Sequence, residues 1–210
     1  CDVYITGSNA YLLSGELATL LSGRYIEIKM LPLSFKEYVS AFPQDSNKDR
    51  LYQQYLLNSS FPYTLELSRP KDIRQYLEGI YDSIVLKDIV ARKRFQDVDM
   101  LRSVVRFLFS NIGNLCSTKK IADTMTSAGR KISVHTVESY LTALTDSFIF
   151  YRAGRYDIKG KQYLKTGDKY YAADIGLRYN VLGTQKADQG HILENIVYLE
   201  LLRRGYEVYV

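Results

Sequence analysis

Apolar and polar side chains alternate at the start of the chain in a way that predicts two strands with a helix between them. Residues 2–5 read as a buried strand, and residues 25–30 alternate between apolar and charged side chains. Between these strands, apolar residues recur at helical spacing until Gly23, where the helix should end. Ser34 and Glu37 then have the spacing of a capping box, so a further helix should begin there.

The next part of the chain is predicted to be helical. Residues 1–40 read as an α/β unit that is too short for a complete doubly wound domain. A helical pattern with one proline-bracketed break follows over residues 41–96, which we expect to form a lid-like helical region. Its apolar stripe should consist of Ile73, Leu77, Ile80, Tyr81, Ile84 and Val85.

Residues 97–185 combine three predicted helices with two tyrosine-rich strands. The first two helices should end at Gly113 and Gly129, and Ser133 should cap the third. The strand-like runs are FIFYRAGRYD and KYYAADIG, on either side of the loop IKGKQYLKTG. Three helices followed by a β-hairpin is the order of a winged-helix domain.

The last predicted unit, residues 186–210, starts with a helix that should end at Gly205, and a strand follows from Tyr206. One face of this helix collects the apolar side chains of Ile192, Ile196, Leu199 and Leu202.

Composition narrows the class of protein. Of the 210 residues, 46% are hydrophobic and 24% are charged, which is typical of a globular chain. The formal net charge of +5 permits contact with nucleic acid or another polyanion without requiring it. Cys1 and Cys116 have no metal-type spacing, and we expect a reducing cytoplasm. The sequence shows no membrane-spanning run and no secretory signal, so we expect no membrane partner.

The third predicted helix of residues 97–185 is poorly suited to reading bases. Its candidate contact residues are His135, Thr136 and Ser139, and no Lys or Arg lies between residues 133 and 147. Arginine bound to guanine is the commonest specific contact in the major groove. Contact with DNA shape or phosphates is therefore favoured over base readout.

Basic residues surround that helix instead. With tyrosines interleaved along the hairpin, they could follow a phosphate backbone, or they could form a solvated surface on a domain that contacts protein. Both interpretations stay open. The candidate phosphate contacts are Lys119, Lys120, Arg130, Lys131, Arg152, Arg155, Lys159 and Lys161.

Other common chemistries find little support. His135 and His191 are the only histidines, and neither has partners at a zinc-ligand spacing. No G-x-x-x-x-G-K-[ST] phosphate loop occurs in the chain. The turn Gly7-Ser8-Asn9 after the first strand could simply cap the next helix, or it could lie beside the γ-phosphate of a bound nucleotide.

The stretch ITGSNAYLLSGELATLLSGRYIEIKMLPLSFKEY resembles the C-terminal half of the ATPase core in a prokaryotic AAA-type family that carries a C-terminal DUF4143 domain. Further segments resemble that family in the same order, namely FPYTLEL, YLEGIYDSIVLKDIV, the RFLFSNIGNLCSTKKIAD region, YYAADIGLRYN and GHILENIVYLELLRRGYEVYV. The resemblance implies a mixed, mostly helical fold in which a partial P-loop ATPase sheet precedes the helical region, a winged-helix domain and the start of a restriction-endonuclease-like domain.

The resemblance also implies roles for particular residues. Ser8 and Asn9 match the sensor-1 polar positions, and Arg24 matches an arginine that reaches the phosphates of a neighbouring subunit. The parent protein would bind ATP and Mg²⁺ and self-associate through the ATPase face. Because the phosphate loop would lie before Cys1, we expect this stretch alone to need no cofactor and to be inactive.

Glu194 matches a helix glutamate of the nuclease-like fold, where carboxylates and a lysine hold a divalent metal. Glu194 is equally consistent with a first-turn glutamate favoured by the helix dipole. Our first interpretation is a fragment of an AAA-type ATPase whose winged-helix region contacts DNA or protein. The alternatives are a stand-alone DNA-binding module and a metal-dependent nuclease regulated by the ATPase.

Overall fold

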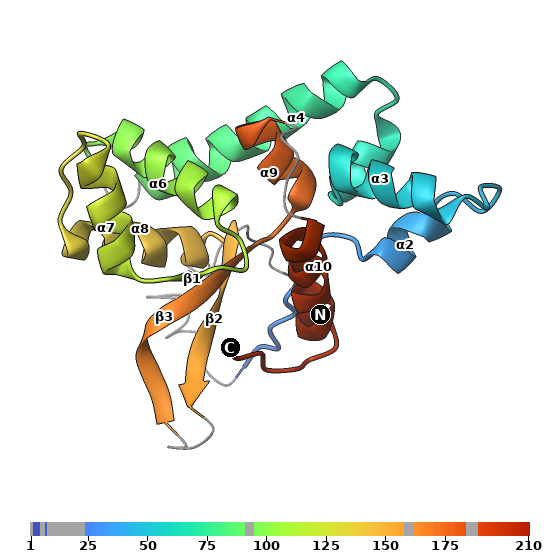
Figure 1. The fold of residues 1–210 in the computed structure, drawn as a ribbon. Coiled ribbons are helices and arrows are strands. Elements are labelled where there is room, and N and C mark those ends of the chain that lie inside the picture. The colour runs from blue at the N-terminus through green and yellow to red at the C-terminus, as the bar shows by residue number, and fades with distance from the viewer. Residues whose placement is uncertain (1, 5–6, 8–23, 91–94, 158–161, 184–188) are drawn as a thin grey trace.

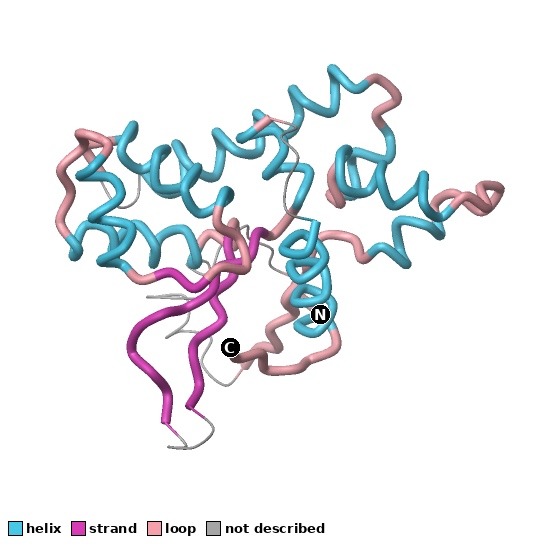
Figure 2. Tube along the Cα trace, in the orientation of Figure 1, coloured by secondary structure: helices cyan, strands magenta, loops and turns pink. Residues whose placement is uncertain are grey.

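The computed structural model describes residues 2–4, 7, 24–90, 95–157, 162–183 and 189–210. Helices dominate this part of the chain, and a small antiparallel sheet projects from them (Figure 1). Figure 2 shows the two long strands of the sheet extending away from the helices as a hairpin. The mixed α/β, mostly helical fold class predicted from the sequence is therefore confirmed.

In the described part of the chain, four short helices follow residues 24–34, and a π-helical segment continues the last of them. They are α2 (Phe35–Ser40), α3 (Lys48–Asn58), the 3₁₀ helix η2 (Pro62–Glu66), α4 (Pro70–Asp82) and η3 (Ser83–Val90). The predicted capping box is present, because the Ser34 N–H donates to Glu37 Oε2 at 2.7 Å and the Glu37 N–H donates to Ser34 Oγ at 3.1 Å. The predicted break between Pro62 and Pro70 is also confirmed.

The strand predicted over residues 25–30 is wrong. These residues form no strand, and the apolar side chains expected to be buried lie in solvent, with Ile26 90% and Met30 88% exposed. A strand must pair its backbone groups with a neighbouring strand, and no described strand lies beside this segment. The strand and helix predicted before it involve residues 5–6 and 8–23, which lie outside the described residues.

The three helices predicted after residue 97 are confirmed. They are α6 (Val98–Ser110), α7 (Thr118–Ser127) and α8 (Val134–Asp146). Each begins at a side chain that accepts a hydrogen bond from a first-turn N–H, namely Asp97, Ser117 and Ser133.

The sheet contains one strand that the sequence did not predict. The hairpin strands are β2 (Phe150–Asp157) and β3 (Gln162–Ala172), and the additional strand is β1 (Leu115–Cys116). The order is β1-β3-β2, with Phe150 opposite Ala172 and Leu115 opposite Lys169. A strand of two residues is too short to show an alternating pattern.

A short helix, α9 (Ile175–Leu182), replaces the end of the second predicted strand. Its first four residues are all buried, Arg178 included, so the helix lacks the amphipathic pattern that would predict it. Arg178 in this helix donates through Nε to the Phe109 carbonyl at 2.7 Å and thereby satisfies a carbonyl in the last turn of α6.

Helix α10 (Gln189–Arg203) lies beside the hairpin (Figure 1) and is attached to it by a buried amide. Asn195 is 0% exposed, its Oδ1 accepts from the Ala172 N–H at 2.7 Å, and its Nδ2 donates to the Ala172 carbonyl at 2.9 Å. Of the predicted apolar face, Ile192 and Leu199 are buried, and Ile196 and Leu202 are partly buried. Asn195 thus completes the hydrogen bonding of Ala172 where no further strand does so.

Residues 206–210 do not form the predicted regular strand. Among the described residues, Val210 pairs with the sheet: its N–H donates to the Gly154 carbonyl at 3.0 Å, and its carbonyl accepts from the Tyr156 N–H at 2.9 Å. This pairing occupies part of the open edge of β2.

One hydrophobic cluster contains buried side chains from Tyr38 to Ile192, and a smaller cluster under α10 includes Tyr171 and Tyr198. The larger cluster crosses the expected boundaries at residues 96 and 185. The division into units 1–40, 41–96, 97–185 and 186–210 stays a prediction. None of the described helices is both long and apolar enough to cross a bilayer.

The early helices and α9 approach one another closely at Gly176. A Cβ atom there would lie 2.4 Å from the Ser59 nitrogen and 2.5 Å from the Ser59 Cα. Ser59 itself has a φ of 78°, in the left-handed region that most residues avoid. Backbone therefore meets backbone at this point, and neither side has a flexible atom that could yield.

Gly176→Ala should lower the free energy of unfolding by about 3 kcal/mol, because the new methyl group must displace the Ser59 backbone. Gly79→Ala is the matched control, since that glycine lies inside α4 with no atom within 4 Å of an added Cβ. It should stabilise the protein by about 0.5–1 kcal/mol through helix propensity. Urea unfolding of both variants measures this difference, and equal effects of the two substitutions would contradict the close packing at Gly176.

Candidate functional site

The residues expected to act on a nucleotide are only partly described. Ser8 and Asn9 lie outside the described residues, and Arg24 is an exposed residue at a bend. The sequence holds no phosphate loop. The described residues therefore do not by themselves form a site that fits ATP and Mg²⁺, and the roles of Ser8, Asn9 and Arg24 stay predictions.

The exposed face of α8 is neutral to acidic. The His135 side chain is 91% exposed, and its Nδ1 lies 3.9 Å from Glu138 Oε2. Thr136 Oγ1 is hydrogen-bonded to Ser133 Oγ at 2.8 Å, and Ser139 Oγ donates to the His135 carbonyl at 3.1 Å. The hydroxyls of Thr136 and Ser139 are thus engaged within the helix and its cap.

The opposite face of α8 packs into the core. Val137, Leu141 and Leu144 are buried. Phe148 is only partly buried and has a φ of 57°, and its ring lies 6.5 Å from that of Tyr151.

Two of the candidate DNA-contact residues, Arg130 and Arg152, already interact with acidic or polar groups of the protein. Arg130 donates to the Asp99 carbonyl at 3.1 Å and to Ser103 Oγ, so it ties the turn before α8 to the first turns of α6. Arg152 Nε lies 2.7 Å from Asp168 Oδ2 on the neighbouring strand. These interactions weaken the case for Arg130 and Arg152 as phosphate contacts, although they leave the prediction untested.

Other candidate contacts remain accessible. Lys119, Lys120, Lys131 and Arg155 are exposed, and none forms an ion pair with a described residue. Lys159 and Lys161 lie outside the described part of the chain.

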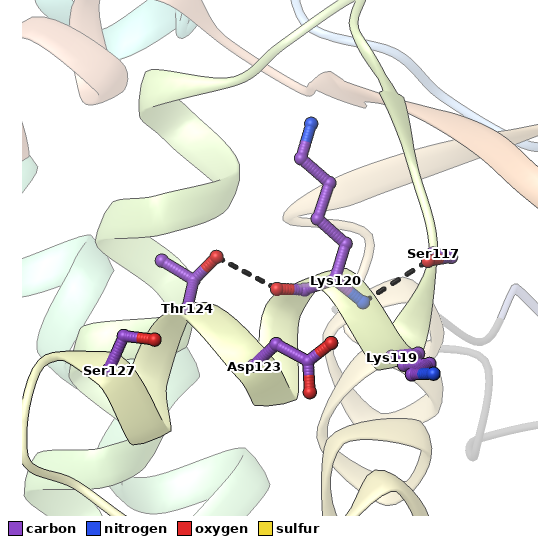
Figure 3. Close-up of a pocket in the computed structure, with 6 residues that line it drawn as sticks. All are labelled: Ser117, Lys119, Lys120, Asp123, Thr124 and Ser127. Carbon is purple, nitrogen blue, oxygen red and sulfur yellow. Dashed lines mark hydrogen bonds between the residues drawn. The ribbon is translucent and has the colours of Figure 1, made fainter.

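An open hollow of about 480 Å³ lies at α7, and its lining includes two of these lysines (Figure 3). In Figure 3 the Lys120 and Lys119 side chains point in different directions from the first turn of α7, and Asp123 lies between Lys119 and Thr124 along the helix. The hollow is lined by Ser117, Lys119, Lys120, Asp123, Thr124 and Ser127.

Asp168 and Cys116 form a buried pair where β1 meets β3. They are paired in register, and they are 8% and 4% exposed. Asp168 Oδ1 is buried and has no hydrogen-bond partner among the described residues. Burial, together with the Asp168 charge, raises the pKa of the Cys116 thiol, while Lys120 opposes the rise. A raised pKa disfavours the reactive thiolate form of Cys116.

Glu194 lies at the centre of a charged cluster between α10 and β3. Its Oε1 is 2.7 Å from Lys169 Nζ and accepts a hydrogen bond from the Tyr171 hydroxyl at 2.6 Å. Its Oε2 lies 3.5 Å from His191 Nδ1. Gly113 packs directly against the cluster, because a Cβ atom added at this position would lie 2.9 Å from His191 Nδ1.

The charges in this cluster stabilise one another. Burial by itself would raise the pKa of the Glu194 carboxyl, but the bonds from Lys169 and Tyr171 and the Lys169 charge outweigh it, so the pKa lies below its ordinary value. Burial and the Glu194 carboxylate raise the pKa of the Tyr171 phenol. The Tyr171 ring also stacks on Tyr198, with centroids 4.0 Å apart. Glu194 therefore fastens α10 to the sheet, and its metal-binding role stays a prediction.

The sequence did not connect Glu194 with Lys169 or Tyr171, because 23 to 25 residues separate them. Lys169 and Tyr171 are two residues apart, so on a strand they lie on the same face. That spacing was the sequence signal that could have brought the two residues together. No group of three or more His, Cys, Asp or Glu side chains that could hold a metal ion occurs within the described residues.

Glu194→Gln should destabilise the protein by about 1 kcal/mol at pH 7, because it removes a charge-assisted bond to Lys169. The folded pKa of Glu194 is below the unfolded value of 4.5. Its contribution is therefore complete above that value and is lost as the pH falls through the folded pKa. Urea unfolding at pH 7 and at about pH 3 measures the difference, and exposed Glu78→Gln is the control. An equal loss at both pH values would contradict this interpretation.

The chain is similar to two protein families and to two curated relatives. Residues 49–188 match the domain of unknown function DUF8612, and residues 1–39 match an AAA domain family. An uncharacterized protein of Haemophilus influenzae is 50% identical over 210 residues, which cover 99% of this chain and 52% of that protein. The uncharacterized protein MJ1544 of Methanocaldococcus jannaschii is 29% identical over 216 residues, which cover 98% of this chain and 48% of that protein. No solved structure matches.

This chain spans about half the length of the curated relatives it matches. The AAA-type part of the predicted resemblance is confirmed over residues 1–39. The other part needs correction, since the domain found is DUF8612 where DUF4143 was expected. The chain belongs to the DUF8612 family, and its first 39 residues match an AAA domain.

Proposed function

We propose that this chain is part of an ATP-hydrolysing AAA-type protein and that residues 97–182 form the winged-helix-like arm with which that protein contacts its target. The match of residues 1–39 to an AAA domain carries the proposal. The arm supports it, because the order α6-β1-α7-α8-β2-β3, with β1 on the outer edge of β3, follows the helix and hairpin order of a winged helix.

The nucleotide chemistry would depend on residues outside the described fold. ATP would supply the phosphoryl group, and Mg²⁺ would neutralise the charge that develops on it during transfer. We propose that the polar side chains of Ser8 and Asn9 lie near that nucleotide. We also propose that Arg24 of one subunit approaches the nucleotide bound to the next subunit. The exposed position of Arg24 leaves its guanidinium free to reach a second copy of the protein.

Arg24→Ala in the full-length protein should reduce ATP hydrolysis by about 10³-fold or more, because an arginine finger stabilises charge on the transferring phosphoryl group. Nucleotide affinity should change little. Steady-state phosphate release and equilibrium binding of a fluorescent ATP analogue measure the two quantities. Arg74→Ala, at an exposed position of α4, is the matched control. Hydrolysis that is unchanged by Arg24→Ala would reject the role of this arginine.

A second proposal concerns the target. The exposed Lys119, Lys120 and Lys131 favour contact with the phosphates of DNA over contact with base edges, since α8 exposes an acidic side chain and contains no Lys or Arg. A protein target is the alternative outcome. The nuclease alternative has less support, because Glu194 is already bound by Lys169 and Tyr171. A cytoplasmic location stays a prediction.

The double variant Lys119→Ala, Lys120→Ala should weaken DNA binding about equally for unrelated sequences. It should also reduce the slope of log K against log salt by about 1 for each phosphate that the variant no longer neutralises. Filter-binding titrations between about 50 and 200 mM salt measure both effects, with Lys71→Ala in α4 as the control for charge. Absence of DNA affinity in the unaltered protein, or affinity that ignores salt, would reject the DNA proposal and favour a protein target.

A further inference from the structure

Residues 31–34, the segment Leu31-Pro32-Leu33-Ser34, are held from two directions where the AAA-type match approaches its end at residue 39. On one side, the Leu33 N–H donates to the Ser60 carbonyl at 2.8 Å, and the Leu33 carbonyl accepts from the Tyr55 hydroxyl at 3.0 Å. On the other side, the Pro32 carbonyl accepts a hydrogen bond from Arg203. The backbone of the segment is therefore bonded both to α3 with the turn after it and to α10.

The contacts on the first side continue to the start of α9, just after β3. Ser60 donates through its N–H and its Oγ to Asp174 Oδ2, at 2.7 and 2.6 Å. Asp174 Oδ1 accepts from the Leu177 N–H at 2.6 Å and thereby caps α9. A continuous series of hydrogen bonds thus joins Leu33 to the start of α9.

These contacts are buried, which limits how they can respond to movement. Tyr55, Ser60 and Asp174 are 7%, 4% and 2% exposed. A buried donor or acceptor that loses its partner has no water to replace it. Displacement of Leu33 should therefore carry Ser60 and Asp174 with it, because the alternative is to leave polar groups unsatisfied.

The second side passes through the last turn of α10. Arg203 Nη1 lies 3.1 Å from Glu200 Oε2, and its Nε lies 3.8 Å from Glu37 Oε2, the oxygen that also accepts from Ser34 in the capping box. The Ser34 bonds, together with the Arg203 charge, lower the pKa of the Glu37 carboxyl. The same helix is attached to β3 through Asn195. Both routes from residues 31–34 thus reach the region where β3 ends.

We propose that residues 31–34 are the joint that couples the AAA-type segment to the arm, through Tyr55, Ser60 and Asp174 on one side and Arg203 on the other. A nucleotide-dependent change in the AAA-type segment then alters the end of β3 and α9. If nucleotide binding changes the affinity of the arm for its target by some factor, target binding changes nucleotide affinity by that same factor, because the coupling is reciprocal. This inference rests on the proposed function and adds the route by which the two parts regulate one another.

Hydrogen exchange in the full-length protein, with and without a non-hydrolysable ATP analogue, tests the joint. In the unaltered protein the analogue should change the exchange rates of amides in residues 170–178 by a factor of about 5 or more, the low end of allosteric coupling. In the double variant Tyr55→Phe, Arg203→Gln, that factor should fall below about 2 while analogue affinity stays the same. Each single variant should give an intermediate factor, so the singles provide the test if the double variant does not fold.

The matched controls are Tyr52→Phe and Arg204→Gln. Tyr52 belongs to the same helix as Tyr55 and packs against Phe35, and Arg204 pairs with Glu200 at 2.8 Å. Neither control should reduce the exchange response. A response that persists in the folded double variant would overturn the joint, and so would analogue binding that leaves residues 170–178 unchanged in the unaltered protein. Analogue binding is measured first, since a protein that binds no nucleotide overturns the proposed function, and the joint with it.

Discussion

The hydrogen bonds around Asp174 connect the turn after α3 to the start of α9, which directly follows the sheet. This carboxylate is 2% exposed, and burial raises its pKa while bonds from Ser60, Leu177 and Ser59 oppose that rise. A buried carboxyl group is tolerated only when its oxygens are satisfied. That requirement brings the turn at Ser59 and Ser60 against the start of α9, and it explains why position 176 must lack a Cβ atom. Helices separated by more than a hundred residues in sequence therefore share one core.

At the end of β3, side chains of α10 supply hydrogen bonds that a neighbouring strand would otherwise provide. Asn195 supplies a donor and an acceptor to Ala172, and Glu194 binds Lys169 and Tyr171 slightly earlier along the strand. The two neighbouring residues of α10 thus meet the same strand in different ways, one through buried backbone bonds and one through a partly exposed ion pair. The first fixes position, and the second adds a contribution that depends on pH.

The basic residues of the arm divide into two groups with different consequences for function. Arg130, Arg152 and Lys169 bind neighbouring side chains or carbonyls and hold the arm together. Lys119, Lys120 and Lys131 are exposed on α7 and the turn after it. A count of cations in the sequence treats all of them alike, whereas a phosphate attracts most strongly those that no nearby carboxylate already neutralises. Within the described part of the arm, fewer cations are therefore available to a polyanion than the sequence alone indicates.

Elements with local signals could be predicted from the amino-acid order alone. The capping box at Ser34 and Glu37, the helices α6, α7 and α8 with the Ser133 cap, and the burial of Ile192 and Leu199 on α10 followed from local patterns. Long-range contacts in the folded chain settled the conformation of residues 25–30, the presence of β1 and α9, and the partners of Glu194 and Asp174. Alternation of side chains shows that a strand could form, but pairing requires another backbone at the right distance. In the same way, a carboxylate in the sequence has no defined role until folding brings distant donors within hydrogen-bond reach.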